Sequence, residues 1–567
     1  MNAILKASLK VVAQLLPCAV FFTAVERGFA QDSWTGGGTP TAGQYLWSDP
    51  NNWTDGVPSD GATETITFSG TTGLNSYEDI VPPANSYAYF VGGINFDSTA
   101  GAYTLSGLQF ALFGSADYSG AINNNSSSTI TIDNDIVLGN DSGLAANSSG
   151  DLVLNGNIND NGHSLGFLAN STGAVTQTGV VSGNGNFVVF DGSSANIYVN
   201  GNNTYSGQTL IFGGTVNLGS SVIAGQNGAL GNVAQASGNE FIQMGATTAP
   251  GLTASLLTNG NDLVIERDIN IVSPTSGTSN MTIGNAASGT SSTLSGVITL
   301  GSAYSAAQGV TLTAASNSQF IVSGNIQKNT GITGSGDTVT KTGAGVVQLS
   351  GLSNYQGGTT VMAGTLLVTG TAYQAGAYTV QSGASLGGAG GTINTSGAGV
   401  TLQAGAGLDI SGQRTGYAIT PGTLTLNLSG GALDLSQAVT GSSGLLSFAL
   451  ATPSTSDQVL LGSGSALNIG SGLLGLNDFS FTTKTGFGAG QYVLFDTSSP
   501  TAISGSLGLD LTGFVGDYSA TLAEGFDNSG NQDIFLDVTA VPEPSEMALF
   551  LSGLLVLVVV MRRKQNS

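Results

Sequence analysis

The sequence predicts an all-β protein whose main part is a solenoid of stacked parallel coils. Three observations support this fold class: the composition, an internal repeat, and short alternating segments inside each copy of the repeat. Glycine supplies 87 of the 567 residues, and only 8% of the residues are charged although 40% are hydrophobic. Because glycine, Asn, Ser and Thr favour turns while β-branched residues favour strands, this composition is typical of many short strands.

The internal repeat consists of two segments, 197–218 and 347–368, that align without a gap. The matched positions are Tyr205 with Tyr355, Gly207 with Gly357, Thr209 with Thr359, and Gly214-Thr215 with Gly364-Thr365. Each copy contains three short alternating strands, which cannot bury their apolar face alone. Such coils need neighbours above and below, as in a solenoid. We expect Gly357 to supply a positive φ angle at a turn.

The second copy lies in a longer segment, 341–368, that opens with Lys341-Thr342-Gly343 and closes with a Gly-Thr-Leu sequence. This segment resembles the autotransporter-associated β-strand repeat, and 197–218 resembles it without the Lys-Thr-Gly opening. In that family the repeats build a right-handed parallel β-helix in secreted passenger domains. The resemblance therefore implies a right-handed β-solenoid, which we place at 102–440.

The first 30 residues are predicted to be a signal peptide. Lys6 and Lys10 precede an apolar stretch, 11–25, and small residues lead up to Ala30. Signal peptidase is therefore expected to cut after Ala30. The single cysteine, Cys18, lies inside this peptide, so the mature chain would hold no disulfide.

The C-terminal segment, 541–567, is predicted to be a sorting signal. It contains Pro542-Glu543-Pro544, an apolar run of 15 residues at 547–561, and the cations Arg562, Arg563 and Lys564. A helix needs about 20 apolar residues to span hydrocarbon, but terminal cations can snorkel, so we expect a marginal transmembrane helix over 547–561. The cations should stay in the cytoplasm. The segment resembles the PEP-CTERM signal, which implies processing by an exosortase at the inner membrane; the alternative is an ordinary anchor.

The segment 31–101 is predicted to cap the N-terminal end of the solenoid, because an open solenoid end exposes unpaired strand and apolar surface. It holds all three tryptophans, Trp34, Trp47 and Trp53. We interpret them as packing residues of the cap. Stacking of exposed indole rings on sugars is the functional alternative.

The closing region, 441–540, is predicted to be a C-terminal β cap or a small sandwich. Its aromatic density is higher than that of the preceding chain. Alternating residues at 491–495 and 533–538 predict antiparallel strands there.

Charge excludes one class of partner. The chain carries a formal net charge of −23, and few basic residues lie between the two terminal signals. These cations are Arg267, Lys328, Lys341, Arg414 and Lys484. They form no basic patch in the sequence, so nucleic-acid binding is not expected. An anionic polysaccharide would be repelled unless divalent cations bridged it to the protein.

No arrangement of residues in the sequence predicts catalysis or a cofactor. His163 is the only histidine and lies in a turn-like stretch, so we interpret it as a solvated loop residue. A Ser-His-Asp triad and a His-rich zinc site are both unsupported. Carboxylates that a hydrolase could use are Asp133, Asp135, Asp409, Asp434, Asp533 and Asp537. Acids in turn-rich chains usually cap turns. The turns at 133–135 and 157–161 offer oxygen ligands suited to calcium.

The sequence therefore predicts an exported, non-enzymatic surface or matrix protein that contributes to adhesion, biofilm or an exopolysaccharide matrix. The alternative is a carbohydrate-binding or polysaccharide-degrading β-helix. Acids and aromatics clustered on one solenoid face would favour the alternative. A uniform Ser, Thr and Asn face would favour the structural function.

Overall fold

The computed structural model describes residues 31–82, 86–114, 121–190, 196–234, 241–275, 277–301, 308–329, 336–412, 420–439 and 444–541. The chain divides into two compact units, Met1–Ala377 and Tyr378–Ser567. Within the described ranges, the only helical elements are two short 3-10 turns, η1 (Pro50–Asn52) and η2 (Leu476–Asp478). The predicted all-β class is confirmed.

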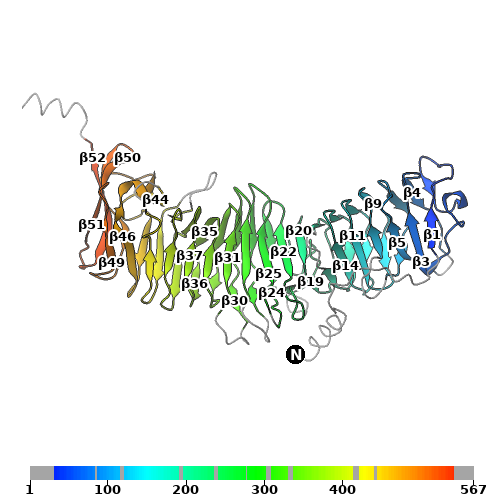
Figure 1. Cartoon of the computed structure of the whole chain (residues 1–567), viewed down its shortest axis with the longest axis horizontal. Helices are drawn as coiled ribbons and strands as arrows, with labels where there is room; N and C mark the ends of the chain where they lie inside the picture. Colours follow the sequence, from blue (N-terminus) through cyan, green and yellow to red (C-terminus); the bar gives the residue numbers. More distant parts are fainter. Residues whose placement is uncertain are drawn as a thin grey trace, which may run out of the picture. The chain divides into compact units, whose positions relative to one another are not determined.

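The first unit is a stack of coils in which each strand pairs in parallel with the equivalent strand of the next coil (Figure 1). One column of paired strands, here the first column, runs through the whole unit. Its strands are β2 (Tyr45–Leu46), β4 (Asn75–Glu78), β6 (Thr104–Gly107), β9 (Ile130–Ile132), β12 (Leu152–Leu154), β15 (Val175–Gln177), β18 (Asn196–Val199), β20 (Gly214–Leu218), β22 (Thr253–Thr258), β25 (Asn280–Asn285), β28 (Val310–Ala314), β31 (Val339–Thr342) and β34 (Thr359–Val361).

Two further columns complete the later coils of this unit. The second column contains β23 (Leu263–Ile265), β26 (Ser291–Leu294), β29 (Gln319–Val322), β32 (Val346–Leu349) and β35 (Gly364–Val368). The third column contains β24 (Ile269–Ile271), β27 (Ile298–Leu300), β30 (Ile326–Lys328), β33 (Leu352–Ser353) and β36 (Thr371–Gln374). A coil such as β31–β32–β33 therefore has three short strands. The parallel solenoid is thus observed, and its right-handed sense stays an expectation from the resemblance.

The core of the first unit is formed by alternate residues of each strand. In the first column, Leu256, Ile283, Leu312 and Val361 stack in register and are fully buried. Burial of one such side chain contributes about 1.5–3 kcal/mol. Lys341 occupies the position between Leu312 and Val361 in this apolar row, where a cation is unexpected.

The repeat at 347–368 has the strands that the sequence predicts. Val347 and Leu349 lie on β32 and face the core, and Thr359 and Val361 do so on β34. The last strand, β35, pairs in parallel with β32, so that Leu366 stacks on Val347. The copy therefore begins in one coil and ends in the next, so the repeat includes the pairing of two neighbouring coils.

The three tryptophans pack together at the start of the first unit. Trp34 and Trp53 meet edge to face at 4.7 Å between ring centroids, and Trp47 contacts Trp53 in the same way at 5.6 Å. Each indole is at most 4% exposed. Their Nε1 groups donate hydrogen bonds to Gly73 O, Ser76 Oγ and Trp47 O. These rings are therefore packing residues, and none is free to stack on a sugar.

The second unit also begins as a parallel stack. Its first column is β37 (Tyr378–Val380), β40 (Val400–Leu402), β43 (Ala432–Asp434), β46 (Ala466–Leu474) and β49 (Ile503–Leu507). It ends in an antiparallel sheet of β48 (Gly490–Asp496), β52 (Gln532–Ala540), β51 (Tyr518–Phe526) and β50 (Thr512–Val515). Gln491 pairs with Asp537 and Val493 with Phe535, so the antiparallel strands expected at 491–495 and 533–538 are confirmed.

The structure places the ends of the parallel stack differently from the predicted limits of 102–440. Parallel pairing already joins β1 (Gln31–Trp34) to β3 (Gly61–Phe68) and β3 to β5 (Tyr89–Phe96), within the predicted cap. In the second unit, parallel pairing is still present at β49, well inside the predicted closing region. The predicted limits relied on a rise in tryptophan and phenylalanine content at each end. These aromatic residues lie in segments with the same parallel pairing, so the change in composition does not mark the end of that pairing.

The expected role of Gly357 is wrong. Positive φ angles occur instead at Gly214 and Gly364, at 68° and 63°. Gly357 is a glycine because a Cβ there would lie 2.1 Å from Asp337 O of the preceding coil. Its N–H donates to that same oxygen at 2.7 Å. The constraint on this residue is the close approach of two coils.

Replacing Gly357 with alanine is expected to destabilise the solenoid by about 1–3 kcal/mol, because the added methyl group would push two hydrogen-bonded coils apart. Urea unfolding of the full chain measures the loss. Gly61→Ala is the matched control, since a Cβ at Gly61 would meet no atom within 4 Å. Equal stability of the two variants would contradict the close-approach explanation.

Candidate functional site

The residues predicted to carry sorting lie outside the described part of the chain. This applies to the cleavage point after Ala30, to Pro542, Glu543 and Pro544, and to Arg562, Arg563 and Lys564. The predicted transmembrane helix over 547–561 lies outside it as well. Within the described ranges, no helix is both long and apolar enough to cross a membrane. Both terminal signals stay predictions.

The candidate carboxylates of the first unit accept hydrogen bonds from the neighbouring coil. Asp135 accepts a hydrogen bond from the backbone N–H of Asn157 at 2.7 Å, one coil further on. Asn157 in turn accepts one from the backbone N–H of Val180 at 3.0 Å. Asp133 accepts from the Asn155 amide at 2.8 Å. These acids cap the turns, which is the structural use that the sequence favours.

The candidate carboxylates of the second unit also bond within the protein. Asp434 accepts from Ser436 N and from the Asn468 amide, each at 3.0 Å. Asp537 accepts from the Gln491 amide at 2.9 Å, and Asp409 has an interaction as well. Asp533 accepts from Thr497 N at 2.8 Å, and burial raises its pKa to about 6. None of these contacts joins two of the candidate acids as a catalytic pair.

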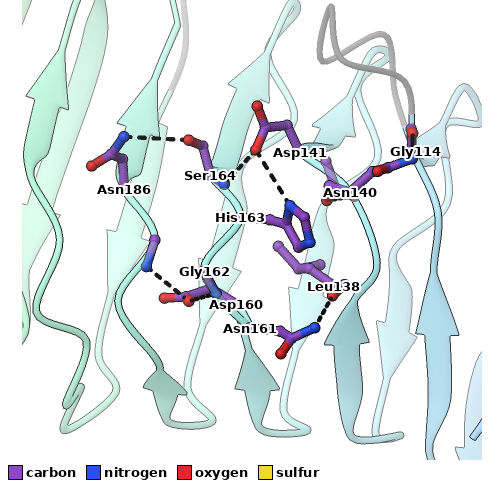
Figure 2. A network of polar contacts seen from close by, with 12 residues as sticks. Gly114, Leu138, Asn140, Asp141, Asp160, Asn161, Gly162, His163, Ser164 and Asn186 are labelled. Atoms are coloured by element: carbon purple, nitrogen blue, oxygen red, sulfur yellow. Dashed lines mark hydrogen bonds and ion pairs between the residues drawn. The ribbon is translucent and has the colours of Figure 1, made fainter. Parts of the chain in front are cut away.

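His163 lies on a corner between two coils, beside Asp141 (Figure 2). Its Nδ1 is 3.9 Å from Asp141 Oδ1, and about a third of each side chain is exposed. The Asp141 carboxylate also accepts the backbone N–H of Ser164 at 2.7 Å. The Ser164 hydroxyl accepts from the Asn186 amide at 3.4 Å and is not bonded to the imidazole. The geometry therefore matches a half-exposed loop histidine and provides no activated nucleophile.

Asp160 organises the turn that carries His163. Its Oδ1 accepts the backbone N–H groups of Gly162 at 2.8 Å and Gly185 at 2.9 Å (Figure 2). Asn161 adopts a φ of 50°, which is tolerated by asparagine in tight turns. Burial raises the pKa of Asp160, although these hydrogen bonds to its charged form oppose the rise. The sequence showed the turn but not the carboxylate that holds it.

In the turns considered for calcium, side-chain oxygens of Asp133, Asp135, Asn157 and Asp160 already accept hydrogen bonds from the protein. Across the described ranges, no group of three or more His, Cys, Asp or Glu side chains is arranged to hold a metal ion. A hollow of about 240 Å³ near the end of the second unit is lined by Leu476, Asn477, Phe479, Phe481, Gly513, Phe514, Val515 and Gly516. Its lining has no ionisable side chain. Calcium binding at 133–135 or 157–161 stays an untested expectation.

Lys341 makes structural contacts in the repeat that sequence reasoning did not predict. It is fully buried, and its Nζ donates to Thr342 O, Gly343 O and Ala363 O, each at 2.8 Å. The ammonium group thus ties the turn after β31 to the turn after β34, one coil later. Desolvation by burial lowers its pKa to about 7. The Lys-Thr-Gly opening of the segment is the sequence feature that could have indicated this role of Lys341.

The tyrosine and threonine of each repeat copy form a buried pair. Tyr205 and Thr209 share a hydrogen bond between their hydroxyl groups at 2.9 Å. Tyr355 and Thr359 share the same bond in the second copy. Around the first pair, Arg267 is buried and donates to Thr209 Oγ1 at 3.2 Å and to Leu230 O at 2.6 Å. Each hydroxyl pair thus joins residues four apart within one coil, and Arg267, from outside the motif, supplies the bond that reaches the first pair from another coil.

The comparisons with known proteins identify the same two segments. The model of the passenger-associated-transport-repeat matches residues 198–218 and 339–368. A comparison with curated proteins gave no match. Among solved structures, the Hap adhesin of Haemophilus influenzae is similar, at 12% sequence identity and a TM-score of 0.22. That alignment covers 87% of this chain and 66% of the adhesin chain, so this chain spans just under two thirds of its length.

The chain therefore carries two autotransporter-type passenger repeats. They lie within the parallel solenoid of the first unit, at β18–β20 and β31–β35. Lys341, Tyr355 and Thr359, which belong to the motif, are buried, and Lys341 bonds to Ala363 one coil later.

Replacing Lys341 with methionine is expected to remove a pH dependence of stability. The folded-state pKa of about 7 is below the ordinary value of 10.5, so between these values the unfolded chain binds more protons than the folded chain. The free energy of unfolding of the natural chain therefore rises with pH across this interval. Lys341→Met lacks this gain and also loses donors to three carbonyl groups.

Chemical unfolding at pH 7, 8 and 9 measures this effect as the difference between the natural chain and the variant. The difference should widen as the pH increases. Lys484→Met removes a positive charge outside the first unit and should leave the pH trend of the natural chain unchanged. A constant difference for Lys341→Met would contradict the assignment of a buried, titrating amine.

Proposed function

We propose that this chain is an exported, non-enzymatic β-solenoid that acts at the cell surface or in the extracellular matrix, in adhesion or biofilm formation. The observation that carries the proposal is the match of the passenger-associated-transport-repeat to coils of the solenoid. In this proposal the buried residues of the repeats serve as structural material of the solenoid. Their buried contacts are consistent with that use.

The chemistry of the side chains supports a structural function over an enzymatic one. The carboxylates considered for hydrolysis accept hydrogen bonds from backbone N–H groups or amides, as Asp135 and Asp434 do. Polysaccharide hydrolysis needs two carboxyl groups facing one bond, one of them as an acid. His163 contacts the Asp141 carboxylate, and the nearby Ser164 hydroxyl accepts from Asn186 instead of bonding to the imidazole (Figure 2).

We further propose that export uses signal peptidase after Ala30 and an exosortase at Pro542-Glu543-Pro544. The precursor would be held in the inner membrane by residues 547–561, with Arg562, Arg563 and Lys564 in the cytoplasm. Processing would then place the mature chain at the cell surface or outside the cell. The support for this route is the order of motifs at the two ends of the sequence.

Deleting Pro542-Glu543-Pro544 is expected to leave the precursor in the inner membrane, because the processing enzyme would lose its recognition motif. Immunoblots of membrane and extracellular fractions measure the distribution. The double substitution Ser545→Ala and Glu546→Ala, directly after the motif, serves as the control and should be processed normally. Unchanged processing of the deletion would count against exosortase handling.

Incubation of the exported chain with the producing cell's own polysaccharide is expected to leave the polysaccharide length unchanged. Size-exclusion chromatography of the polysaccharide, before and after incubation, measures chain shortening. A known polysaccharide hydrolase in parallel reactions controls for substrate accessibility. Release of shorter products by this chain would defeat the structural function and favour the enzymatic alternative.

A further inference from the structure

The outward side of the first column carries a continuous row of hydroxyl groups. Backbone pairing places six residues in register on consecutive coils of the first unit. These residues, here the threonine ladder, are Thr215, Ser255, Thr282, Thr311, Thr340 and Thr360. Each one is partly exposed, whereas its neighbours along the strand point into the core. Neighbouring strands lie about 4.8 Å apart, so the hydroxyls repeat at about that interval.

The surface around the threonine ladder is uncharged. A second row, two residues further along each strand, adds Thr313 and Thr342 in register. The outward positions of β22, β25, β28, β31 and β34 are Thr253, Ser255, Leu257, Asn280, Thr282, Gly284, Thr311, Thr313, Thr340, Thr342 and Thr360. None of them is charged, and only one is a large apolar residue. The face therefore offers hydroxyl and methyl groups over five consecutive coils.

Among the described residues, the hydroxyls of the threonine ladder make no hydrogen bond within the protein, whereas three glutamines on the other columns each bond to a neighbouring coil. In the second column, Gln319 donates to Gln348 at 2.8 Å, and Gln348 donates to Thr369 at 2.8 Å. In the third column, Gln327 donates to Thr299 at 3.2 Å. Within the described part of the chain, no hydroxyl of the threonine ladder has a hydrogen-bond partner. The ladder thus keeps its donors and acceptors available.

Charge and polarity restrict what can lie on this face. The chain has a net charge of −23 and the ladder has no cation, so an anionic ligand would be repelled. A second copy of the chain would bring the same negative charge. An apolar partner would leave six hydroxyl groups without hydrogen bonds, which is costly once water is excluded. A neutral partner rich in hydroxyl groups satisfies both conditions.

We propose that the threonine ladder binds an extended, neutral polysaccharide that runs along the column, across the strands. The strand spacing of about 4.8 Å is close to the length of one sugar ring in an extended chain, so each coil would meet about one ring. Threonine hydroxyls would bond to sugar hydroxyls, and the methyl groups would contact ring C–H groups. Because χ1 of threonine is restricted, little conformational freedom is lost on binding. Many weak, evenly spaced contacts would add along the chain.

This inference rests on the proposed surface function and adds a partner class and a binding face to it. The uniform Ser, Thr and Asn face that is expected of a structural protein would then itself bind a glycan, without the clustered acids and aromatics of a degrading enzyme. Glycan binding and cell adhesion are therefore measured separately, so that the failure of one can be told from the failure of the other. Adhesion lost on deletion of the whole gene tests the surface function. Glycan binding by ladder variants tests the inference.

The test uses the full chain and a double variant, Thr311→Val and Thr340→Val, at the centre of the threonine ladder. Valine keeps the shape and the strand preference of threonine and removes only the hydroxyl. Co-sedimentation with swollen cellulose, a neutral β-1,4-glucan, and affinity electrophoresis in dextran, a neutral α-1,6-glucan, measure binding. Alginate is the anionic comparison. The natural chain should bind at least one neutral glucan and not alginate, and the double variant should bind about tenfold more weakly.

Thr299→Val is the matched control, because Thr299 is an outward threonine of the third column whose hydroxyl already accepts from Gln327. It should bind as the natural chain does. Thermal unfolding of each variant shows whether a loss of binding comes from a loss of folding. Both ladder positions point outward, so the double variant should unfold within a few degrees of the natural chain.

Several results would overturn the inference. The natural chain could fail to bind either neutral glucan, or the double variant could bind as well as Thr299→Val. Ice-crystal shaping that depends on the threonine ladder, without glucan binding, would assign the face to ordered water. Self-association in sedimentation velocity that the double variant loses would assign it to a second copy.

Discussion

Hydrogen bonding between consecutive coils is the constraint on which the rest of this structure depends. Each strand of a column satisfies its backbone groups on the strand one coil away, so residues about 20–30 positions apart in sequence lie about 4.8 Å apart in space. Where two coils come closer, a side chain no longer fits. Gly207 and Gly357 are such points, since a Cβ would meet Gly185 O at 1.8 Å and Asp337 O at 2.1 Å. At these points glycine is a requirement of stacking.

The same constraint determines where the ionisable groups go. Corners between strands leave backbone N–H and C=O groups that no strand partner satisfies, and buried groups of this kind must find other partners. Carboxylates such as Asp135 and Asp160 accept the N–H groups, and the ammonium group of Lys341 donates to three carbonyls. Asp135 and Asp160 are therefore each held by hydrogen bonds at their own corner.

The local pattern of the sequence predicted much of the fold but not the contacts between coils. Alternation located the strands around Val347 and Val361 and the antiparallel strands at 491–495 and 533–538, because it depends on neighbouring residues only. The roles of Gly357 and Lys341 depend on the coil above or below, whose register a single copy does not contain. The ends of the stack were misplaced because aromatic residues can lie inside coils as well as in caps. The predicted sorting residues lie beyond the described chain.

Exposure to water does not by itself explain the threonine ladder. Outward positions of the other columns are exposed too, and there the chain places Gln319, Gln348 and Gln327, whose amides bond to neighbouring coils. Those side chains help to hold the stack together. A row of threonines adds strand preference and solubility but no bond between coils. What distinguishes the threonine ladder is its register: six uncharged hydroxyl residues follow one another on consecutive coils, which gives the face an evenly spaced set of donors and acceptors suited to a neutral partner.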